Sequence, residues 1–512
     1  MQTVQLERRY LPLLAAGLIF AFAMLVTLMT VTTISGGHLV YALDDPYIHL
    51  ALARQVAQGH YGINPGEFSA PASSILYPLL LAPFFWLRLP LWGPLVLNLA
   101  AALASLFVLW LLLERGLRGL PEARRRFWTG VVLILSIVTF NLVGQVLEGM
   151  EHLLQLWASL LALWGVRRVE DEGRLPPWLP AALVLGPLLR YENLMVSILA
   201  LVYLLWRGRL LPTALTLVAL MLTLGGFTLF LKAHGLGPLP TSILAKSSTG
   251  SLAGLWANTQ WNVNRPEGQC LLASTILALG LGAWRRGREG GMLAALSCIP
   301  LTHLVFGAVG FGRYEIYALA LATIGALLLL GQVKRGAILG LAPLVMLVLG
   351  HPYLNHTLAA TRATHFVYEQ QYQMARFVRE YVKKPVAVND IGLVAYEGDQ
   401  YVLDLWGLAC KEALDKHRTE KTNAWMCELA KRQGVGVVML YDWWFHRDLP
   451  PSWIKVGELY LSQPGVYVSG NIVSFYATEA SGEAALRRQL KAFRPTLPPG
   501  VSLVLTGEAV PN

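Results

Sequence analysis

Two adjacent carboxylates, Asp44 and Asp45, directly follow the first long apolar run of the sequence. One carboxylate of such a pair can act as a general base on a hydroxyl group, while the other holds a metal ion or a sugar hydroxyl. Their mutual repulsion is expected to raise the pKa of one of them. A plainer interpretation is that Asp44 only caps a helix that begins at Pro46. Capping and catalysis are compatible, so both aspartates are candidate catalytic residues.

A second group of ionisable residues follows a later apolar run. Glu148, Glu151 and His152 have the spacing i, i+3 and i+4, so they would share one face of a helix. Such a face can contact a ligand, or it can cap a membrane interface beside an arginine. For Glu148 and His152 we favour the interfacial role.

Two short motifs place a cation and an anion at the ends of apolar runs, at Arg190–Glu192 and Arg313–Glu315, and both read Arg-Tyr-Glu. An arginine fork can bind a phosphate through two parallel hydrogen bonds. An ion pair that anchors two helices explains each motif about as well. Lys246, in the loop GPLPTSILAKSS, is a further phosphate-binding candidate, although lysines at membrane interfaces are often only anchors.

The composition indicates a membrane protein. Of 512 residues, 55% are hydrophobic and 14% are charged, a balance that is unusual for a soluble domain. The formal charge of +10 comes with arginines clustered between apolar runs, which indicates membrane topology and not nucleic-acid binding. The four cysteines contain no metal-ligand or redox spacing. Cys410 and Cys427 are either a disulfide in an oxidising compartment or two free thiols.

The apolar runs predict about eleven transmembrane helices, some shorter than the usual length. They lie near residues 10–33, 93–113, 127–147, 152–166, 177–190, 193–206, 210–231, 270–284, 291–310, 316–333 and 336–353. The first is expected to stay as a signal anchor with a cytoplasmic N-terminus. Five basic loops then fall on the cytoplasmic side. This topology requires residues 75–89, which contain Pro78 and Pro83, not to cross the bilayer.

The predicted architecture is a polytopic α-helical membrane protein with a small C-terminal extracytoplasmic α/β domain. The transmembrane domain covers residues 1–354, with outer loops at 34–92 and 232–269, and the α/β domain covers 355–512. In the outer loop, the segment after Asp45 is expected to form an amphipathic helix along the membrane surface that holds the carboxylates in place.

In the C-terminal domain the sequence pattern predicts both strands and helices. The expected strands cover 385–395, 434–441 and 471–477, and the expected helices cover 361–383 and 411–432. The proline-containing stretch after Pro495 is expected to be a loosely held tail.

The order of the polar motifs resembles that of the type C (GT-C) glycosyltransferases, integral membrane enzymes that use polyprenyl-phosphate-linked sugars. The resemblance covers nearly the whole chain. In order, the segments are DDPYIHLALARQVAQGHYGINPG, PASSILYPLLLAP, EGMEHLLQL, LLRYENLM, GPLPTSILAKS, FGRYEIYAL and DIGLVAYEGDQYVLDLWGLA. No single motif is specific, but their order is. The sequence departs from the family at Tyr191 and Asn193, where relatives often have Pro and Gly.

The resemblance implies that Asp44 or Asp45 is the catalytic base and that basic residues stabilise the lipid-phosphate leaving group. The implied substrate- and lipid-phosphate-binding residues are Glu151, Arg190, Glu192, Lys246, Arg313 and Tyr314. Displacing a lipid phosphate from an anomeric carbon needs a deprotonated acceptor and cations for the leaving oxyanion, and the motif set contains both. No cofactor is certain, and a divalent cation, Mg²⁺ or Mn²⁺, stays open because the acidic pair has no clear third ligand.

The predicted function is transfer of a sugar from a polyprenyl-phosphate donor to an acceptor at the outer face of a bacterial-type inner membrane. The expected partners are the lipid-linked sugar, membrane lipid and an acceptor glycan, lipid or protein, without nucleic acid. The alternative is a membrane transporter or lipid or glycolipid flippase, for which broken helices are typical. A receptor or assembly scaffold is a third hypothesis, but it does not explain the acidic loop.

Overall fold

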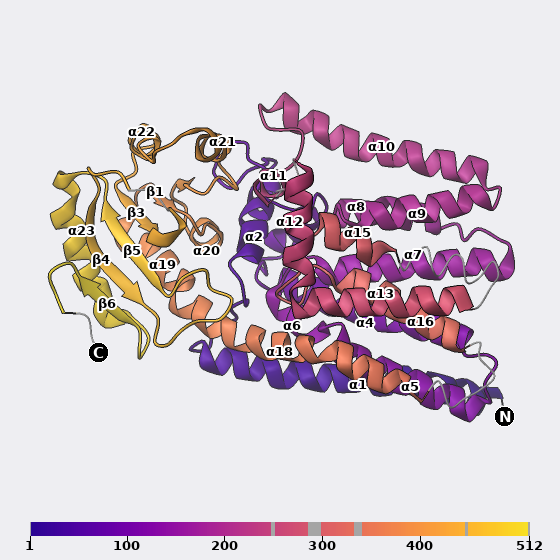
Figure 1. Cartoon of the computed structure of the whole chain (residues 1–512). Helices are drawn as coiled ribbons and strands as arrows, with labels where there is room; N and C mark the ends of the chain where they lie inside the picture. Colours follow the sequence, from indigo (N-terminus) through magenta and orange to yellow (C-terminus); the bar gives the residue numbers. More distant parts are fainter. Residues whose placement is uncertain (1, 247–250, 285–297, 332–339, 446–448, 510–512) are drawn as a thin grey trace. The chain divides into compact units, whose positions relative to one another are not determined.

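The structure is a computed structural model, and it describes residues 2–246, 251–284, 298–331, 340–445 and 449–509. The chain forms two compact units (Figure 1). The helical unit consists of Met1–Met29, Pro94–Gly226 and Ser248–Ala359. The α/β unit consists of Thr30–Gly93, Phe227–Ser247 and Ala360–Asn512. The units are groups of contacting residues, so the predicted boundary between a transmembrane and an outer domain at 354/355 stays a prediction.

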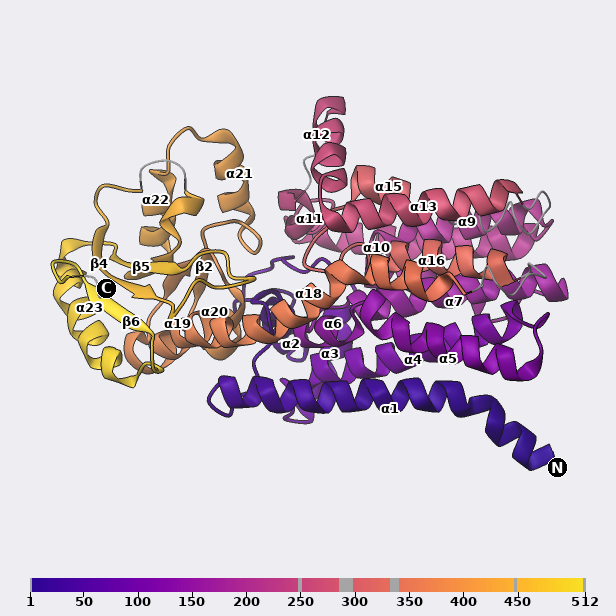
Figure 2. The same cartoon turned by 60° about the horizontal axis from the view of Figure 1, so that its bottom comes forward.

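The helical unit is a bundle in which most helices run side by side (Figures 1 and 2). Its helices are α4 (Trp92–Gly116), α5 (Glu122–Thr139), α6 (Leu142–Glu148), α7 (His152–Glu172), α8 (Leu179–Leu189), α9 (Asn193–Trp206), α12 (Leu252–Val263), α13 (Pro266–Trp284), α15 (Ile299–Phe306) and α16 (Ile316–Gly331). Helices α1 (Gln2–Ile34), α10 (Leu210–Ala233) and α18 (Ala342–Glu369) have residues in both units, and so does α4 through its first two residues. In the bundle α7 packs on α8 and α16, and α13 packs on α16.

Within the described residues, four helical segments are long and apolar enough to cross a membrane. They are Arg8–Ile34, Trp92–Gly116, Glu122–Glu148 and Leu210–Ala233. Large apolar side chains on α1 and α10 are exposed, such as Leu18 at 71%, Phe22 at 69% and Leu222 at 70%. Contiguous exposed apolar surface is unfavourable in water, so these faces suit a hydrocarbon environment. The count of eleven spans and the topology stay predictions, and two of the five basic loops, at 285–288 and 334–335, lie outside the described residues.

The prediction that Glu148, Glu151 and His152 share one helix face is wrong. Helix α6 ends at Glu148, and its C-cap, Gly149, has a φ of +67°. That left-handed conformation stops an α-helix and favours glycine. Helix α7 begins afresh at His152 with Glu151 as its N-cap, so the three side chains belong to a helix break.

The α/β unit is built on a six-stranded mixed sheet in the order β2-β1-β3-β5-β4-β6. The strands are β1 (Val386–Val388), β2 (Val402–Asp404), β3 (Val437–Leu440), β4 (Ile454–Tyr460), β5 (Ile472–Ala477) and β6 (Ser502–Leu505). Strands β2, β1 and β3 are parallel, whereas β5, β4 and β6 pair antiparallel. The helices are α2 (Asp45–Val56), α3 (Tyr77–Trp86), α11 (Thr241–Lys246), α19 (Gln371–Phe377), α20 (Gly392–Glu397), α21 (Lys411–Thr419), α22 (Trp425–Arg432) and α23 (Ala480–Phe493), with a π-helical turn at Val378–Val382.

Apolar side chains cover both faces of the sheet, and Figure 2 shows α21 and α22 on one side and α23 on the other. On the first face Ala387, Val438 and Trp425 belong to one buried cluster. On the other face the ring of Phe377 lies 5.5 Å from that of Phe475 and 5.2 Å from that of Phe493. Successive side chains of a strand point to opposite faces, so the continuous burial of β1 and β3 shows that both faces of the sheet are covered.

Three expectations for this unit are corrected by its long-range pairing. The expected strand at 385–395 is the short β1 followed by α20, and the expected helix at 411–432 is split into α21 and α22. The tail after Pro495 contains β6, which pairs with β4 and is therefore held in the sheet. Cys410 and Cys427 are both free thiols and pack at the margin of the first core.

Helix α2 follows the acidic pair, and it is internal to the α/β unit. Nine of its twelve residues are buried, and it packs against α3 and α20. The prediction of an amphipathic helix with one exposed face on a membrane surface is therefore wrong, because α2 is buried on nearly all sides. Helix α3 has ten residues and spans about 15 Å, about half of a typical hydrocarbon core of roughly 30 Å.

Candidate functional site

The first group of candidate residues surrounds Asp44 in the α/β unit. Asp44 occupies the N-cap position of α2, yet its side chain makes no capping hydrogen bond to that helix. Its carboxylate accepts hydrogen bonds from the backbone N–H groups of Gly392 and Leu393, the latter at 2.8 Å. Asp44 is only 7% exposed. It therefore caps α20, which follows it by nearly 350 residues in the sequence. The interpretation that the Asp44 side chain caps the helix directly after it is wrong.

The close approach of these two segments requires glycine at position 392. A Cβ atom there would lie 2.1 Å from the backbone oxygen of Asp44 and 2.7 Å from its Oδ2 atom. Any larger side chain would push the carboxylate away from the N–H groups that hold it. The glycine of the motif Asp390-Ile391-Gly392 thus leaves the space that the Asp44 carboxylate occupies.

Asp390 is the third carboxylate of this group, and uncharged donors surround it. Gln371 Nε2 donates to Asp390 Oδ2 at 2.9 Å, and the Tyr441 hydroxyl lies 3.1 Å from the same oxygen. The Asp390 and Asp44 carboxyl groups are close enough to influence each other's pKa. Asp45 is close enough to add repulsion to both. We name Asp44, Asp45 and Asp390 the carboxylate cluster.

Burial and mutual repulsion make this cluster more basic than ordinary aspartates. Loss of hydration raises the pKa of Asp44 well above its usual value, and the charge of Asp390 raises it further. Loss of hydration also raises the pKa of Asp390, with a further rise from the charge of Asp45. Asp45 and Asp390 are partly exposed whereas Asp44 is buried. The cluster can therefore hold a proton more readily than isolated carboxylates can.

The second group of candidate residues lies in the helical unit, where Arg190 connects two helix breaks. Arg190 has extended backbone after α8, Glu192 is the N-cap of α9, and Glu151 is the N-cap of α7. The guanidinium of Arg190 lies 2.8 Å from Glu151 Oε1 and 2.5 Å from Glu192 Oε1. This is the helix-anchoring ion pair that we considered as one interpretation of the Arg-Tyr-Glu motif.

Tyr314 brings the second Arg-Tyr-Glu motif to the first. The guanidinium carbon of Arg190 lies 5.8 Å from the centre of the Tyr314 ring, and that of Arg313 lies 4.7 Å from it. Arg313 Nη2 also donates to the Tyr314 hydroxyl at 2.8 Å. His152 contacts the same ring edge-on at 5.2 Å. We name Glu151, Arg190, Glu192, Arg313 and Tyr314 the arginine cluster.

A tight turn presents Arg313. Gly310, Phe311 and Gly312 all have positive φ, and the value of 57° at Phe311 is unusual for a residue with a side chain. Asn141 Nδ2 donates to the carbonyl of Gly312 at 2.9 Å, and Gly310 N–H donates to Glu315 Oε2 at 3.1 Å. The turn is therefore fixed by contacts on both sides.

The structure thus groups five predicted residues in the helical unit, whereas Asp44 and Asp45 belong to the α/β unit. Lys246 ends α11, and its side chain lies outside the described part of the structure. Among the described residues, no three His, Cys, Asp or Glu side chains are grouped to hold a metal ion.

Sequence reasoning did not select Asp390, Gln371 or Tyr441. Asp390 opens the motif DIGLVAYEGDQ, and an Asp two residues before a Gly at the start of a helix was a usable signal. Gln371 and Tyr441 had no such signal, because their contacts depend on the approach of α19 to β3.

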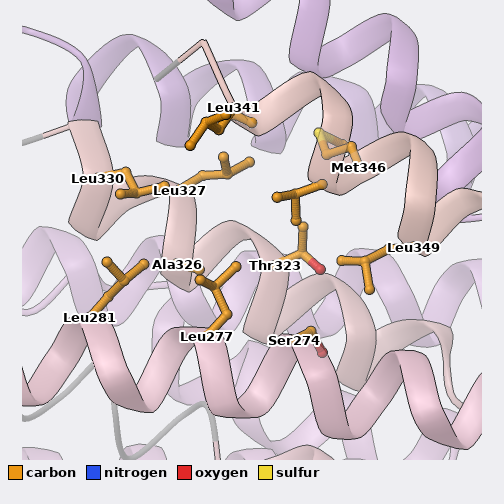
Figure 3. Close-up of a pocket in the computed structure, with 12 residues that line it drawn as sticks. Ser274, Leu277, Leu281, Thr323, Ala326, Leu327, Leu330, Leu341, Met346 and Leu349 are labelled. Carbon is orange, nitrogen blue, oxygen red and sulfur yellow. The ribbon is translucent and has the colours of Figure 1, made fainter. Parts of the chain in front are cut away.

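An apolar cavity of about 180 Å³ lies between α13, α16 and α18 (Figure 3). Half of its lining residues are leucines, and Ser274 and Thr323 are the polar residues among those that line it. Figure 3 shows Leu277, Leu281, Leu327 and Leu330 along one end. Such a wall suits an alkyl chain.

Comparison with known proteins gives partial matches. Residues 360–476 match the model of a family described as a domain of unknown function (DUF8728). No curated protein matches the chain. The oligosaccharyltransferase of Archaeoglobus fulgidus in its apo form is similar with a TM-score of 0.49 and 12% identity, over 90% of this chain and 74% of that one. The same enzyme, tethered to an acceptor peptide with an NVT sequon, gives 0.45 and 12%, over 94% and 76%. Similarity at this level does not establish a shared activity.

Proposed function

We propose that the protein is an integral membrane glycosyltransferase that transfers a sugar from a polyprenyl-phosphate donor to an acceptor at the extracytoplasmic face. The order of the polar motifs supports this proposal, and so do the exposed apolar faces of α1 and α10. The acceptor is a glycan, a lipid or a protein. A divalent cation, Mg²⁺ or Mn²⁺, is a candidate cofactor. Sugar transfer measured with and without the cation would show whether the enzyme requires it.

The observation that carries the proposal is the division of roles within the carboxylate cluster. Two backbone N–H groups hold the buried Asp44 carboxylate, whereas Asp45 is partly exposed at the start of α2. We assign Asp45 as the general base and Asp44 as a positioning residue. Asp390 raises the basicity of the cluster by repulsion.

In the proposed reaction, Asp45 takes the proton of an acceptor hydroxyl while the acceptor oxygen attacks the anomeric carbon of the donor sugar. The bond from the anomeric carbon to the phosphate oxygen breaks, and the electron pair leaves with the polyprenyl phosphate. The leaving phosphate gains one negative charge, which cations stabilise. The proton on Asp45 then passes to solvent.

We propose that Arg313 and Lys246 are the cations for the leaving phosphate. Arg190 already faces the two carboxylates of Glu151 and Glu192, so its proposed contribution is to hold Tyr314 and, through that ring, Arg313. A charge-assisted contact of an arginine with phosphate is stronger than a neutral hydrogen bond.

The test is sugar transfer by the purified full chain carrying Asp45→Asn, with a polyprenyl-phosphate hexose as donor and a membrane glycolipid extract as acceptor. Loss of a general base is expected to slow transfer by about 10² to 10⁴-fold. The matched control is Asp399→Asn, since the Asp399 side chain is 98% exposed, and it should keep full activity. Full activity of Asp45→Asn would show that the base is assigned wrongly.

One feature favours the alternative of a transporter or flippase. The breaks between α6 and α7 and between α8 and α9 carry Glu151 and Arg190, and broken helices with polar residues are typical of transporters. Movement of a lipid-linked sugar across reconstituted vesicles without any covalent product would favour this alternative. Transfer in detergent, where there is no second compartment, would favour the glycosyltransferase.

A further inference from the structure

A cavity of about 220 Å³ with both polar and apolar lining residues lies beside the arginine cluster, between the start of α9, α15 and the start of α16. The lining residues are Tyr191, Glu192, Leu194, Met195, Ile198, Thr302, His303, Phe306, Gly307 and Tyr317. The sequence offered no signal for it, because a single His within an apolar run usually packs in a core.

The hydrogen bonds of His303 determine which groups in the cavity wall accept hydrogen bonds. His303 Nε2 lies 2.8 Å from the carbonyl oxygen of Ala308, which can only accept, so Nε2 carries a proton. The buried ring is neutral in that tautomer, and its Nδ1 accepts from the Tyr317 hydroxyl at 3.2 Å. The remaining lone pairs of the Tyr317 oxygen can then accept from a ligand.

Thr302 and Glu192 offer acceptors in the cavity wall as well. The Thr302 hydroxyl donates to the carbonyl of Ile299 at 2.8 Å, so its oxygen has lone pairs left for a ligand. The Glu192 carboxylate is fixed by Arg190 at 2.5 and 3.1 Å, and each of its oxygens keeps a lone pair. Two carboxylates, Glu151 and Glu192, face the one guanidinium. This wall disfavours an anion such as phosphate and favours a ligand rich in hydrogen-bond donors.

Most of the remaining lining residues are apolar. They are Phe306, which is 63% exposed, Ile198, which is 42% exposed, Leu194 and Met195. A lining that combines hydrogen-bond acceptors with apolar side chains matches a sugar ring, which has hydroxyl groups around its edge and C–H groups on its faces. The apolar rim suits an alkyl chain attached to such a ring.

We propose that this cavity is a binding subsite for the sugar ring of a glycolipid, with Glu192, Thr302 and Tyr317 accepting hydrogen bonds from its hydroxyls. The proposal rests on the glycosyltransferase function, and it names the part of that enzyme that recognises sugar hydroxyls. The sugar comes either from the polyprenyl-phosphate donor or from a glycolipid acceptor, and the two sources share this chemistry.

The test uses the full chain in lipid nanodiscs and three probes with the same alkyl chain: tritiated octyl glucoside, octyl phosphate and octylammonium. Octyl glucoside is expected to show saturable binding above its partition into lipid. Met195→Trp fills the cavity and should weaken that binding at least tenfold. Val202→Trp is the matched control, because Val202 lies two helical turns further along the same face of α9 and is 57% exposed. It should bind like the wild type.

A smaller change measures the polar wall. Tyr317→Phe removes one acceptor and leaves the ring, so it should weaken octyl glucoside binding about fivefold, the effect of one hydrogen bond. Saturable octyl glucoside binding that Met195→Trp does not reduce would overturn the proposal. Equal or tighter binding of octyl phosphate or octylammonium at the same cavity would overturn its ligand class.

Competition binding distinguishes a donor sugar from an acceptor sugar, and the Asp45→Asn variant distinguishes the cavity proposal from the proposed function. Competition by a polyprenyl-phosphate hexose but not by a glycolipid lacking phosphate would assign the cavity to the donor, and the reverse result would assign it to the acceptor. Asp45→Asn should lose transfer and keep octyl glucoside binding. Transfer without cavity binding would overturn only this subsite, whereas cavity binding without any transfer by the wild type would overturn only the proposed function.

Discussion

The helical unit and the α/β unit each hold a group of buried or partly buried charges, and different partners balance the two groups. In the helical unit, Arg190 faces the carboxylates of Glu151 and Glu192 at hydrogen-bond distance. In the α/β unit, Asp44 and Asp390 interact with each other and with uncharged donors from the backbone and from side chains. The first group is a fixed network of opposite charges, and the second is a set of like charges.

This difference indicates which unit can exchange protons. A carboxylate beside a fixed guanidinium stays ionised, so the arginine cluster offers a constant electrostatic field. Like charges in a site with little water cannot all be ionised without cost, so the pKa values of Asp44 and Asp390 are raised. We therefore expect proton transfer to and from the carboxylate cluster. In the arginine cluster we expect Arg190 to hold Tyr314 and Arg313 in position. The following changes would break or sharpen this contrast.

The largest effect is expected for Arg190→Met, which leaves two carboxylates without their guanidinium. Removing one partner of a buried ion pair costs about 3–5 kcal/mol of unfolding free energy. Denaturant unfolding of the full chain in detergent would measure it, with Arg118→Met at an exposed position as the control. The double variant Arg190→Met with Glu151→Gln should recover part of the loss. An equal loss in the control would show that the effect does not come from the ion pair.

A moderate effect is expected for Gly392→Ala, because the added Cβ would collide with Asp44. Overpacking of this kind costs about 1–3 kcal/mol. Gly436→Ala is the matched control in the same unit, since a Cβ there meets nothing within 4 Å. Hydrogen exchange of the amides of residues 392 and 393 should become faster in Gly392→Ala only. Unchanged exchange would mean that Asp44 does not depend on this close approach.

The smallest effect is a change in pH dependence for Asp390→Asn. The pKa values of Asp44 and Asp390 are raised in the folded protein above the value of about 3.9 for an unfolded aspartate. Their stabilisation is thus fully present below about pH 3.9 and is lost as the pH rises through the raised pKa values. Asp390→Asn removes one of the two groups, so the fall of the melting temperature with rising pH should become shallower.

The same melting series with Asp399→Asn should keep the wild-type slope, because that side chain is 98% exposed. A slope in Asp390→Asn as steep as in the wild type would contradict the idea that repulsion within the carboxylate cluster raises the pKa of Asp44.

Local features of the fold were predictable from the sequence. The apolar runs predicted the long helices α1, α4 and α10 because length and hydropathy are properties of the segment itself. The pairing of Arg190 with Glu192 was one of two interpretations of a motif in which the residues are two positions apart. The strands β3 and β5 were predicted as well, since each is a short apolar run between turn signals.

Other features depended on contacts between distant segments. The short β1 ends where α20 must begin to receive Asp44, and β6 forms because β4 offers it an edge. The break after Glu148 was missed because the spacing of acidic residues takes no account of the left-handed Gly149. The ends of β1 and β6 are therefore not encoded within one window of sequence, whereas the break at Gly149 is a local feature.

The sequence by itself determined the residue types that could do chemistry, the apolar helices and the order of the motifs, because these are local properties of the chain. Only the tertiary structure decided that Asp44 caps α20, that Asp390 joins the carboxylate cluster, and that Tyr314 lies beside both Arg190 and Arg313. The physical reason is that burial, and the hydrogen bonds that compensate for it, depend on which distant segments exclude water from a given side chain.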